Sequence, residues 1–223
     1  MLSIRALAKR YPASHARTVF RDVSLELTRG EVVAVMGESG VGKSTLLNLV
    51  AGLDRPDEGR IVIDGVDLAT LDDDAMTRLR RERFGFVFQA FHLLPYLTVA
   101  QNVGLPLALL QRPVDARARR IGAMLDAVGL APRADDSPSR LSGGEMQRIA
   151  IARALVHGPA LVLADEPTGN LDPESASGVL ALLHEQVRAN DAAAIVVTHS
   201  LLAARAADRI VVLTRDGLRP RDA

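Results

Sequence analysis

The sequence contains no cysteine, and this absence removes several classes of chemistry at once. Disulfides, thiolate nucleophiles, cysteine-based zinc sites and iron–sulfur clusters are all excluded, and the composition fits a reducing compartment. No apolar run approaches the ~20 residues that a membrane-spanning helix needs. The segment from Met1 to Arg5 also lacks the pattern of a signal peptide, so we expect the chain to stay in the compartment where it is made.

The chain also has no net charge and very few lysines. The 223 residues include 27 basic and 27 acidic side chains, and this zero net charge argues against a general nucleic-acid binder, so no nucleic-acid partner is expected. Of the basic residues only Lys9 and Lys43 are lysines, a bias that a GC-rich genome explains. With 48% apolar residues, the chain has the composition of an ordinary globular protein.

Short strand-like runs alternate with helical patterns along the chain, which indicates an α/β fold. Helices are expected at Lys43–Gly52 and Asp115–Val128, and the three aspartates at 72–74 are interpreted as a helix cap. From Thr98 to about His157 only helical patterns occur, so this block is inserted between strands of one sheet. Strands are expected at Leu2–Ala8, Val19–Leu27, Glu31–Met36, Gly59–Gly65, Phe84–Phe88, Leu161–Ala164, Ala194–Val197 and Arg209–Leu213.

A glycine-rich segment follows the buried strand at 31–36 and fits the pattern Gly-x4-Gly-Lys-Ser. Its glycines can turn successive N–H groups toward a phosphate at the positive end of the next helix. Lys43 is then expected to reach the β- and γ-phosphates, and Ser44 to coordinate magnesium. The predicted nucleotide-binding residues are Gly37, Glu38, Ser39, Gly40, Val41, Gly42, Lys43, Ser44 and Thr45.

An acidic pair ends another buried strand. Asp165 is suited to hold magnesium, and Glu166 to polarise an attacking water. Together with the glycine-rich segment, the pair predicts a magnesium-dependent nucleotide hydrolase, kinase or switch.

A second glycine-rich segment, Leu141-Ser142-Gly143-Gly144-Glu145-Met146-Gln147, lies between the first one and the acidic pair. Ser142 can cap a helix whose start exposes N–H groups, which makes a second anion site. The segment closely resembles the signature of ATP-binding cassette (ABC) ATPases. The resemblance implies that Ser142, Gly143, Gly144, Glu145 and Gln147 act in trans, on the γ-phosphate held by a second copy in a head-to-tail dimer.

Further positions match the ABC pattern one by one. By this resemblance, Tyr11 stacks on adenine, Gln89 links magnesium and the attacking water to the transport partner, and His199 contacts the γ-phosphate. Asp172 belongs to the loop that couples the two sites of the dimer. The resemblance thus implies ATP and Mg²⁺ as cofactors, with catalytic residues Glu166, His199 and Gln89 and metal ligands Ser44, Gln89 and Asp165.

The resemblance covers nearly the whole chain, from Tyr11 to about Leu213. It implies the α/β fold of a P-loop NTPase, with a mostly parallel core sheet, an N-terminal antiparallel β subdomain and an inserted helical subdomain. We expect one nucleotide-binding domain over 1–223, with the helical subdomain at about 90–157.

Two segments narrow the family branch. Residues 164–172 and 88–95 look most like lipoprotein-releasing (LolD-like), macrolide-exporting and cell-division ATPases, although the second segment also resembles amino-acid importers. That branch implies an ATPase subunit, homodimeric with ATP, bound peripherally to polytopic membrane subunits on the cytoplasmic side of the inner membrane. Its work is export, lipoprotein release or mechanotransmission. Gln89 and the block Phe91–Asn102 are the expected docking surface, although the apolar side chains there fit a subdomain core equally well.

Two alternatives remain after this resemblance, and a third is excluded. A soluble ABC ATPase for cofactor assembly has a similar size, and the ATPase subunit of an importer fits the same motifs. A guanine-reading switch needs an Asn-Lys-x-Asp segment, which Lys9 and Lys43 do not form. The cargo does not follow from this chain, because cargo contacts belong to the membrane subunits.

Overall fold

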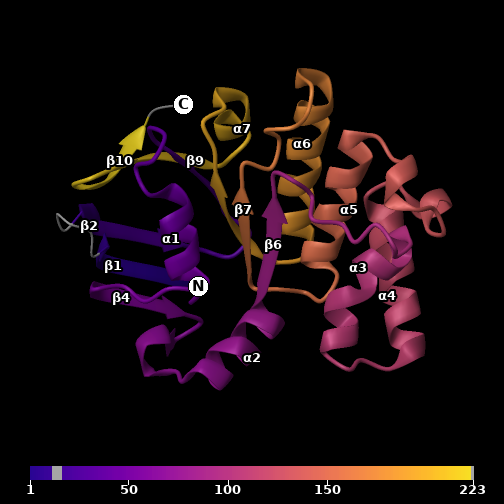
Figure 1. Ribbon diagram of the computed structural model, residues 1–223, viewed down its shortest axis with the longest axis horizontal. Helices are drawn as coiled ribbons and strands as arrows, with labels where there is room; N and C mark the ends of the chain where they lie inside the picture. The colour runs from indigo at the N-terminus through magenta and orange to yellow at the C-terminus, as the bar shows by residue number, and fades with distance from the viewer. Residues whose placement is uncertain (12–16, 222–223) are drawn as a thin grey trace.

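Two β-sheets of different character frame the molecule in the computed structural model, which describes residues 1–11 and 17–221 (Figure 1). The four-stranded sheet has the order β2-β1-β4-β5 and is antiparallel, while the six-stranded sheet has the order β10-β9-β3-β8-β7-β6. In the larger sheet, β10 runs antiparallel to β9 and the other pairs are parallel. The strands are β1 (Leu2–Tyr11), β2 (Arg17–Leu27), β3 (Val32–Met36), β4 (Glu58–Ile63), β5 (Val66–Asp67), β6 (Phe84–Phe88), β7 (Leu161–Asp165), β8 (Ala193–Val197), β9 (Arg209–Thr214) and β10 (Gly217–Arg221). The predicted combination of a mostly parallel core sheet and an antiparallel N-terminal sheet is confirmed.

The helices begin where the sequence offers caps. Asp72 accepts a hydrogen bond from the Ala75 N–H, so the interpretation of the three aspartates as a cap is confirmed. Thr98 and Gln101 form a capping box at the start of α3. The helices are α1 (Lys43–Val50), α2 (Asp73–Arg83), α3 (Val99–Leu109), α4 (Val114–Ala127), α5 (Gly143–Leu155), α6 (Pro173–Ala189) and α7 (Leu201–Arg205), with 3₁₀ turns η1 (Leu68–Thr70), η2 (Ala131–Arg133) and η3 (Pro138–Arg140). Figure 1 shows α3, α4 and α5 gathered at one end of the molecule and the antiparallel sheet at the other.

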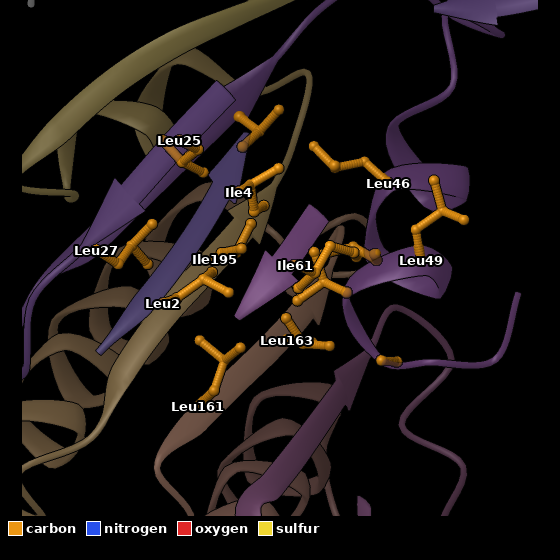
Figure 2. Packing of buried hydrophobic residues seen from close by; sticks show 14 of the residues in the cluster. Leu2, Ile4, Leu25, Leu27, Leu46, Leu49, Ile61, Leu161, Leu163 and Ile195 are labelled. Carbon is orange, nitrogen blue, oxygen red and sulfur yellow. The ribbon is translucent and has the colours of Figure 1, made fainter. Parts of the chain in front are cut away.

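The central strands are buried on both faces. Every residue of β3 and β8 is buried, which matches their continuous apolar sequences and is typical of parallel sheets. One core cluster joins the antiparallel sheet, α1 and the parallel sheet. Figure 2 shows it as side chains from these three sources facing one another: Leu2, Ile4, Leu25, Leu27, Leu46, Leu49, Ile61, Leu161, Leu163 and Ile195. Helix α1 is thereby fixed between the two sheets.

The sequence did not predict two of the strands, β5 and β10. The short β5 pairs with β4 through only a few residues, and β10 consists of Gly217-Leu218-Arg219-Pro220-Arg221. That segment is mostly exposed and lies at a sheet edge, where proline is tolerated because one side of the strand needs no donor. Such edge strands carry little apolar alternation, so their pairing is decided by the neighbouring strand β9.

None of the helices in the described part of the chain is both long and apolar enough to cross a lipid bilayer.

Gly85 on β6 tests the contact between the parallel sheet and α5. A Cβ atom at this position would lie 2.3 Å from the Ala154 carbonyl oxygen, so strand and helix must separate in a Gly85→Ala variant. We expect a loss of about 1–3 kcal/mol in the free energy of unfolding, measured by urea denaturation. Gly122→Ala on α4 is the control, because its Cβ would meet nothing within 4 Å. It should be neutral or stabilising by up to about 1 kcal/mol, and equal stability of both variants would contradict the packing argument.

Candidate active site

Most of the predicted nucleotide-binding residues and the acidic pair meet in one cleft of about 440 Å³, whereas Gly37, Glu38 and Val41 do not line it. The cleft lies where β3 and β7 end, because the carboxyl ends of parallel strands meet at the same edge of a sheet. Its lining combines the loop before α1, the start of α1 and the end of β7 with residues of the antiparallel sheet. These are Tyr11, Val19, Ser39, Gly40, Gly42, Lys43, Ser44, Thr45, Asp165 and Glu166.

The loop before α1 needs glycine for a steric reason at Gly42. This residue has φ +110°, and a Cβ there would lie 2.4 Å from Val19 Cγ1 and 3.0 Å from Phe20 Cδ1. Gly42 is also the N-cap of α1 and provides no side-chain hydrogen bond to it. The first N–H groups of α1 therefore have no side-chain acceptor from the cap, as an anion site at a helix start requires.

Lys43 lies across this loop. Its Nζ donates hydrogen bonds to the carbonyl oxygens of Gly37, at 2.9 Å, and Glu38, at 3.1 Å. The ammonium group is thus held beside the loop whose N–H groups would bind phosphate, where it adds positive charge to the site.

Ser44 and Asp165 come together although they are 121 positions apart in the sequence. The Ser44 hydroxyl donates to Asp165 Oδ2 at 3.0 Å, so a hydroxyl and a carboxylate oxygen share one point of the cleft. Hard oxygen ligands of this kind suit Mg²⁺, which usually takes only one or two protein ligands and keeps its waters and the substrate phosphates. Within the described residues there is no cluster of three or more His, Asp or Glu that could hold a metal by itself. The residues present therefore fit magnesium bound together with a nucleotide.

Glu166 is held in an unusual conformation at the edge of the cleft. Its φ of +48° is rare outside glycine, and such backbone costs about 1–3 kcal/mol. Hydrogen bonds from the Glu166 N–H to Val197 O, at 2.9 Å, and from the Gly169 N–H to Glu166 O, at 3.1 Å, maintain it. Strain of this kind concentrates at functional sites, because the surrounding structure must fix a side chain in one direction.

The Glu166 carboxylate has two partners after β8. Oε1 lies 2.8 Å from His199 Nδ1, and Oε2 accepts a hydrogen bond from Thr198 Oγ1 at 3.1 Å. The Glu166 side chain is 17% exposed, while the His199 side chain is 72% exposed and can meet a ligand or a second chain. The sequence predicted His199 as a site residue but not Thr198. The only sequence signal for Thr198 is a hydroxyl directly after a buried strand.

Gln89 lies beside the cleft, and its side chain is hydrogen-bonded to Asn170. It follows Phe88, which pairs with Asp165 across the β6–β7 ladder. Its Nε2 donates to Asn170 Oδ1 at 3.1 Å, and Asn170 Nδ2 donates back to Gln89 O at 3.0 Å. Among the described residues Gln89 does not line the cleft. Asn170 was also missed as a partner, because no spacing rule connects residues 81 positions apart.

The segment 142–147 forms the start of α5, outside the cleft. Ser142 and Glu145 make a capping box, and Arg133 lies 3.4 Å from the Glu145 carboxylate. The Ser142 N–H is the main cause that lowers the pKa of Glu145, so this carboxylate stays charged in the cap. Gly143 and Gly144 occupy the first turn, as expected for an anion site at a helix start.

Gln147 faces the interior of the chain. It is completely buried, its Nε2 lies 3.5 Å from Phe88 O, and its Oε1 has no hydrogen-bond partner among the described residues. Its side chain therefore packs between α5 and β6, whereas Ser142 and the two glycines are at the accessible end of the helix.

Asp172 is the N-cap of α6. It accepts hydrogen bonds from the Glu174 and Ser175 N–H groups, and hydrogen bonding from the Ser175 side chain is the largest cause that lowers the pKa of Asp172. The residue lies on the surface, directly after the loop that holds Asn170.

A second depression, a groove of about 620 Å³, is lined by residues of α2, β6, α3 and α5. Leu109 and His92 belong to its lining. Of the apolar residues that follow Gln89, Tyr96 is exposed, whereas Leu93 packs against the core of the helical block. Asn102 is fully buried and binds the backbone of Leu94, Leu97 and Thr98. The apolar cluster is thus partly surface and partly core.

Comparisons with known proteins agree with this geometry. The family model described as "ABC transporter" matches residues 20–169. Methionine import ATP-binding protein MetN 2 of Burkholderia mallei is 49% identical over 197 residues, which cover 88% of this chain and 50% of that protein. Macrolide export ATP-binding/permease protein MacB of Shigella flexneri is 44% identical over 218 residues, which cover 97% of this chain and 33% of that protein. The chain thus spans about half or a third of the length of these curated relatives.

A solved structure resembles the whole chain. It is the dimeric structure of a post-hydrolysis state of the ATP-binding cassette MJ0796 bound to ADP and Pi, which is 37% identical, has a TM-score of 0.85 and is covered completely, as this chain is. ABC ATPases bind ATP with Mg²⁺ and hydrolyse it. On the family match, the identities and the shared fold, this chain belongs to the ABC transporter family as an ATP-binding ATPase domain.

Proposed function

We propose that this chain hydrolyses ATP as a subunit of an ABC transporter, with Glu166 as the group that polarises the attacking water. The observation that carries the proposal is the Glu166–His199 contact of 2.8 Å at a cleft that also contains Lys43, Ser44 and Asp165. Thr198 and His199 hold the Glu166 carboxylate in one orientation, in which it can accept a proton from water. His199 orients this carboxylate and contacts the γ-phosphate of the substrate.

The other predicted residues take roles in binding. The loop 37–42 and Lys43 bind the phosphates, and Tyr11 provides the surface for the base. Ser44, Asp165 and Gln89 hold magnesium, which neutralises phosphate charge when it is bound. For Gln89 this requires its amide oxygen, because its Nε2 donates to Asn170.

ATP binding closes a homodimer in this proposal. The cleft and the start of α5 are two anion sites that share no lining residue in the described chain, which supports a head-to-tail pair in which each site completes the other. Ser142, Gly143 and Gly144 contact the γ-phosphate held by the second copy, and Asp172 couples the two sites. Closure stabilised by ATP and reopening after hydrolysis convert binding free energy into movement.

Polytopic membrane subunits are the proposed partners, reached from the cytoplasmic side of the inner membrane. The groove between α2 and α3 and the exposed Tyr96 support docking beside Gln89. Phe88, which precedes Gln89, lines the groove, and Tyr96 follows shortly after Gln89 in the sequence. The chain would then be a single nucleotide-binding domain over 1–223 whose helical subdomain, about 90–157, carries the docking surface.

The direction of transport divides two candidates. We favour export, lipoprotein release or mechanotransmission, and the similarity to the macrolide export protein over 97% of this chain supports that branch. The alternative is an importer, which the 49% identity to the methionine import protein favours.

The Glu166→Gln variant tests the catalytic assignment. The amide keeps the shape of the side chain but is a far weaker base, so we expect ATP turnover to fall by about 10²- to 10⁴-fold while ATP still binds. Phosphate release measures turnover, and gel filtration with ATP should reveal a trapped dimer. Glu185→Gln, on the exposed face of α6, is the matched control and should behave as wild type. Near wild-type turnover of Glu166→Gln would remove the residue from the mechanism.

The Ser142→Arg variant tests the action in trans. The long cation blocks the start of α5, so ATP should no longer dimerise the chain in the Glu166→Gln background, while the monomer binds ATP as before. Since the change also removes a cap, Thr98→Arg serves as control, because Thr98 forms an equivalent capping box on α3. Loss of ATP binding by the Ser142→Arg monomer would contradict a role confined to the partner's nucleotide.

The Leu109→Asp variant tests the docking groove. Leu109 lines the groove and is 63% exposed, so the change should spare the turnover of the isolated chain. We expect it to abolish recovery of polytopic proteins with large extracytoplasmic domains when the chain is captured from its native membrane with ATP and vanadate. Leu53→Asp, at a position 61% exposed outside the groove, should preserve recovery. Recovery of soluble complexes alone by the wild-type chain would overturn the transporter assignment and leave the ATPase intact.

A further inference from the structure

Lys9 is the one lysine that the phosphate site does not explain. The chain uses arginine for all of its basic side chains except Lys9 and Lys43. Lys43 belongs to the phosphate-binding loop, whereas Lys9 lies on β1 and is 7% exposed. A nearly buried ammonium group in a chain so rich in arginine indicates a position that needs a compact cation on a flexible stem.

Lys9 and Asp54 hold the Tyr11 side chain. Lys9 Nζ donates to Asp54 Oδ1 and to Arg55 O, each at 2.7 Å. Tyr11 donates its hydroxyl hydrogen to the second carboxylate oxygen, Asp54 Oδ2, at 2.8 Å. Lys9 Nζ also lies over the Tyr11 ring, 5.0 Å from its centroid. The ring is therefore fixed at its hydroxyl and covered on one face by a cation, while Tyr11 still lines the cleft and is 41% exposed.

The charge states support this arrangement at neutral pH. The hydrogen bond to Asp54 is the largest cause that raises the pKa of Tyr11, so the phenol remains a neutral donor. Burial alone would raise the pKa of Asp54, but hydrogen bonds from Lys9 and Tyr11 outweigh it and lower that pKa. Asp54 is thus a charged acceptor shared by both side chains.

The same contacts connect Tyr11 to the phosphate-binding helix. Asp54 lies shortly after the end of α1, whose first residue is Lys43, and α1 has 8 residues, or about 12 Å of rise. The Asp57 N–H donates to Ala8 O at 3.0 Å, which joins the loop after α1 to β1 a second time. The start of α1 and the Tyr11 ring both line the cleft and are therefore joined by hydrogen bonds of the loop after α1.

We propose that Lys9 and Asp54 are positioning residues for nucleobase binding, which hold the Tyr11 ring so that its uncovered face receives the base. The inference rests on the proposed role of Tyr11 as the base-stacking surface. Neither Lys9 nor Asp54 is among the residues that line the cleft, so we expect them to set the contribution of the base to affinity and to leave phosphate binding unchanged. Fixing the ring before binding reduces the ordering cost on association.

The test compares ADP, which carries the base, with inorganic pyrophosphate, which does not. Isothermal titration calorimetry with Mg²⁺ measures both dissociation constants for the wild type and for Lys9→Met. We expect ADP to bind about 3- to 10-fold more weakly to the variant, because a base stacked on an aromatic ring contributes about that much or more. Pyrophosphate affinity should stay within about twofold, and the KM for ATP should rise while kcat is preserved.

Two further variants sharpen the comparison. Lys9→Arg keeps the charge but replaces the compact ammonium with a planar fork, and it should weaken ADP binding in the same way. Arg5→Met on the same strand is the matched control, because the Arg5 side chain is 74% exposed and its ion pair with Glu26 lies on the surface. It should leave both dissociation constants unchanged.

Each outcome decides the proposal. Equal weakening of ADP and pyrophosphate by Lys9→Met, or no change in either, would overturn it. If Lys9→Met does not fold, Asp54→Ala carries the test, since it removes both carboxylate oxygens to which Lys9 and Tyr11 donate. Tyr11→Ala separates the two levels of inference. If Tyr11→Ala leaves ADP binding unchanged, the base-stacking role of Tyr11 fails, whereas a loss with Tyr11→Ala and none with Lys9→Met removes only the positioning role.

Discussion

The parallel pairing of β3, β8 and β7 is the constraint on which the active site depends. Their ladders align the end of β3, which leads into the phosphate loop, with the end of β7, which carries Asp165. The Ser44–Asp165 hydrogen bond of 3.0 Å exists because this alignment brings α1 to the carboxyl end of a strand far away in the sequence. Because β3 and β8 are buried on both faces, a slip of the register by one residue would exchange the side chains that pack on the two faces and so disrupt the core.

Glu166 shows how this rigid sheet supports a strained residue. Its backbone conformation is unfavourable by itself, and hydrogen bonds to the neighbouring strand end and to the following loop compensate for it. Thr198 and His199 directly follow β8, so the partners of the carboxylate are attached to a strand that cannot move relative to β7 without breaking the sheet. The direction of the carboxylate is thus set by the fold of the core.

Helix α5 connects the surface of the chain with its interior. Its first turn holds Ser142 and the two glycines, and its buried side carries Gln147 against β6. Near its end, Arg153 donates hydrogen bonds to the carbonyl oxygens of Phe91 and His92, at 2.7 and 2.6 Å. Both of these residues have positive φ, so the arginine stabilises the turn that follows Gln89. A displacement of α5 would therefore reach the Gln89 segment through direct contacts.

The sequence alone determined the parts of this protein that depend on local order. The continuous apolar runs predicted the buried strands, the aspartates at 72–74 predicted a helix cap, and the glycine spacing before Lys43 predicted the phosphate loop. These features follow from residue type and spacing, because a buried strand, a cap and a tight loop each place chemical demands on a few neighbouring residues.

Only the tertiary structure decided the contacts between distant segments. The partnership of Gln89 with Asn170, the support of Glu166 by Thr198 and the holding of Tyr11 by Lys9 and Asp54 join residues with no fixed spacing. The edge strand β10 likewise formed because β9 offered unpaired backbone groups, although its own sequence is polar and contains proline. Such contacts depend on which elements the sheet brings side by side, and a single sequence does not carry that information in its local pattern.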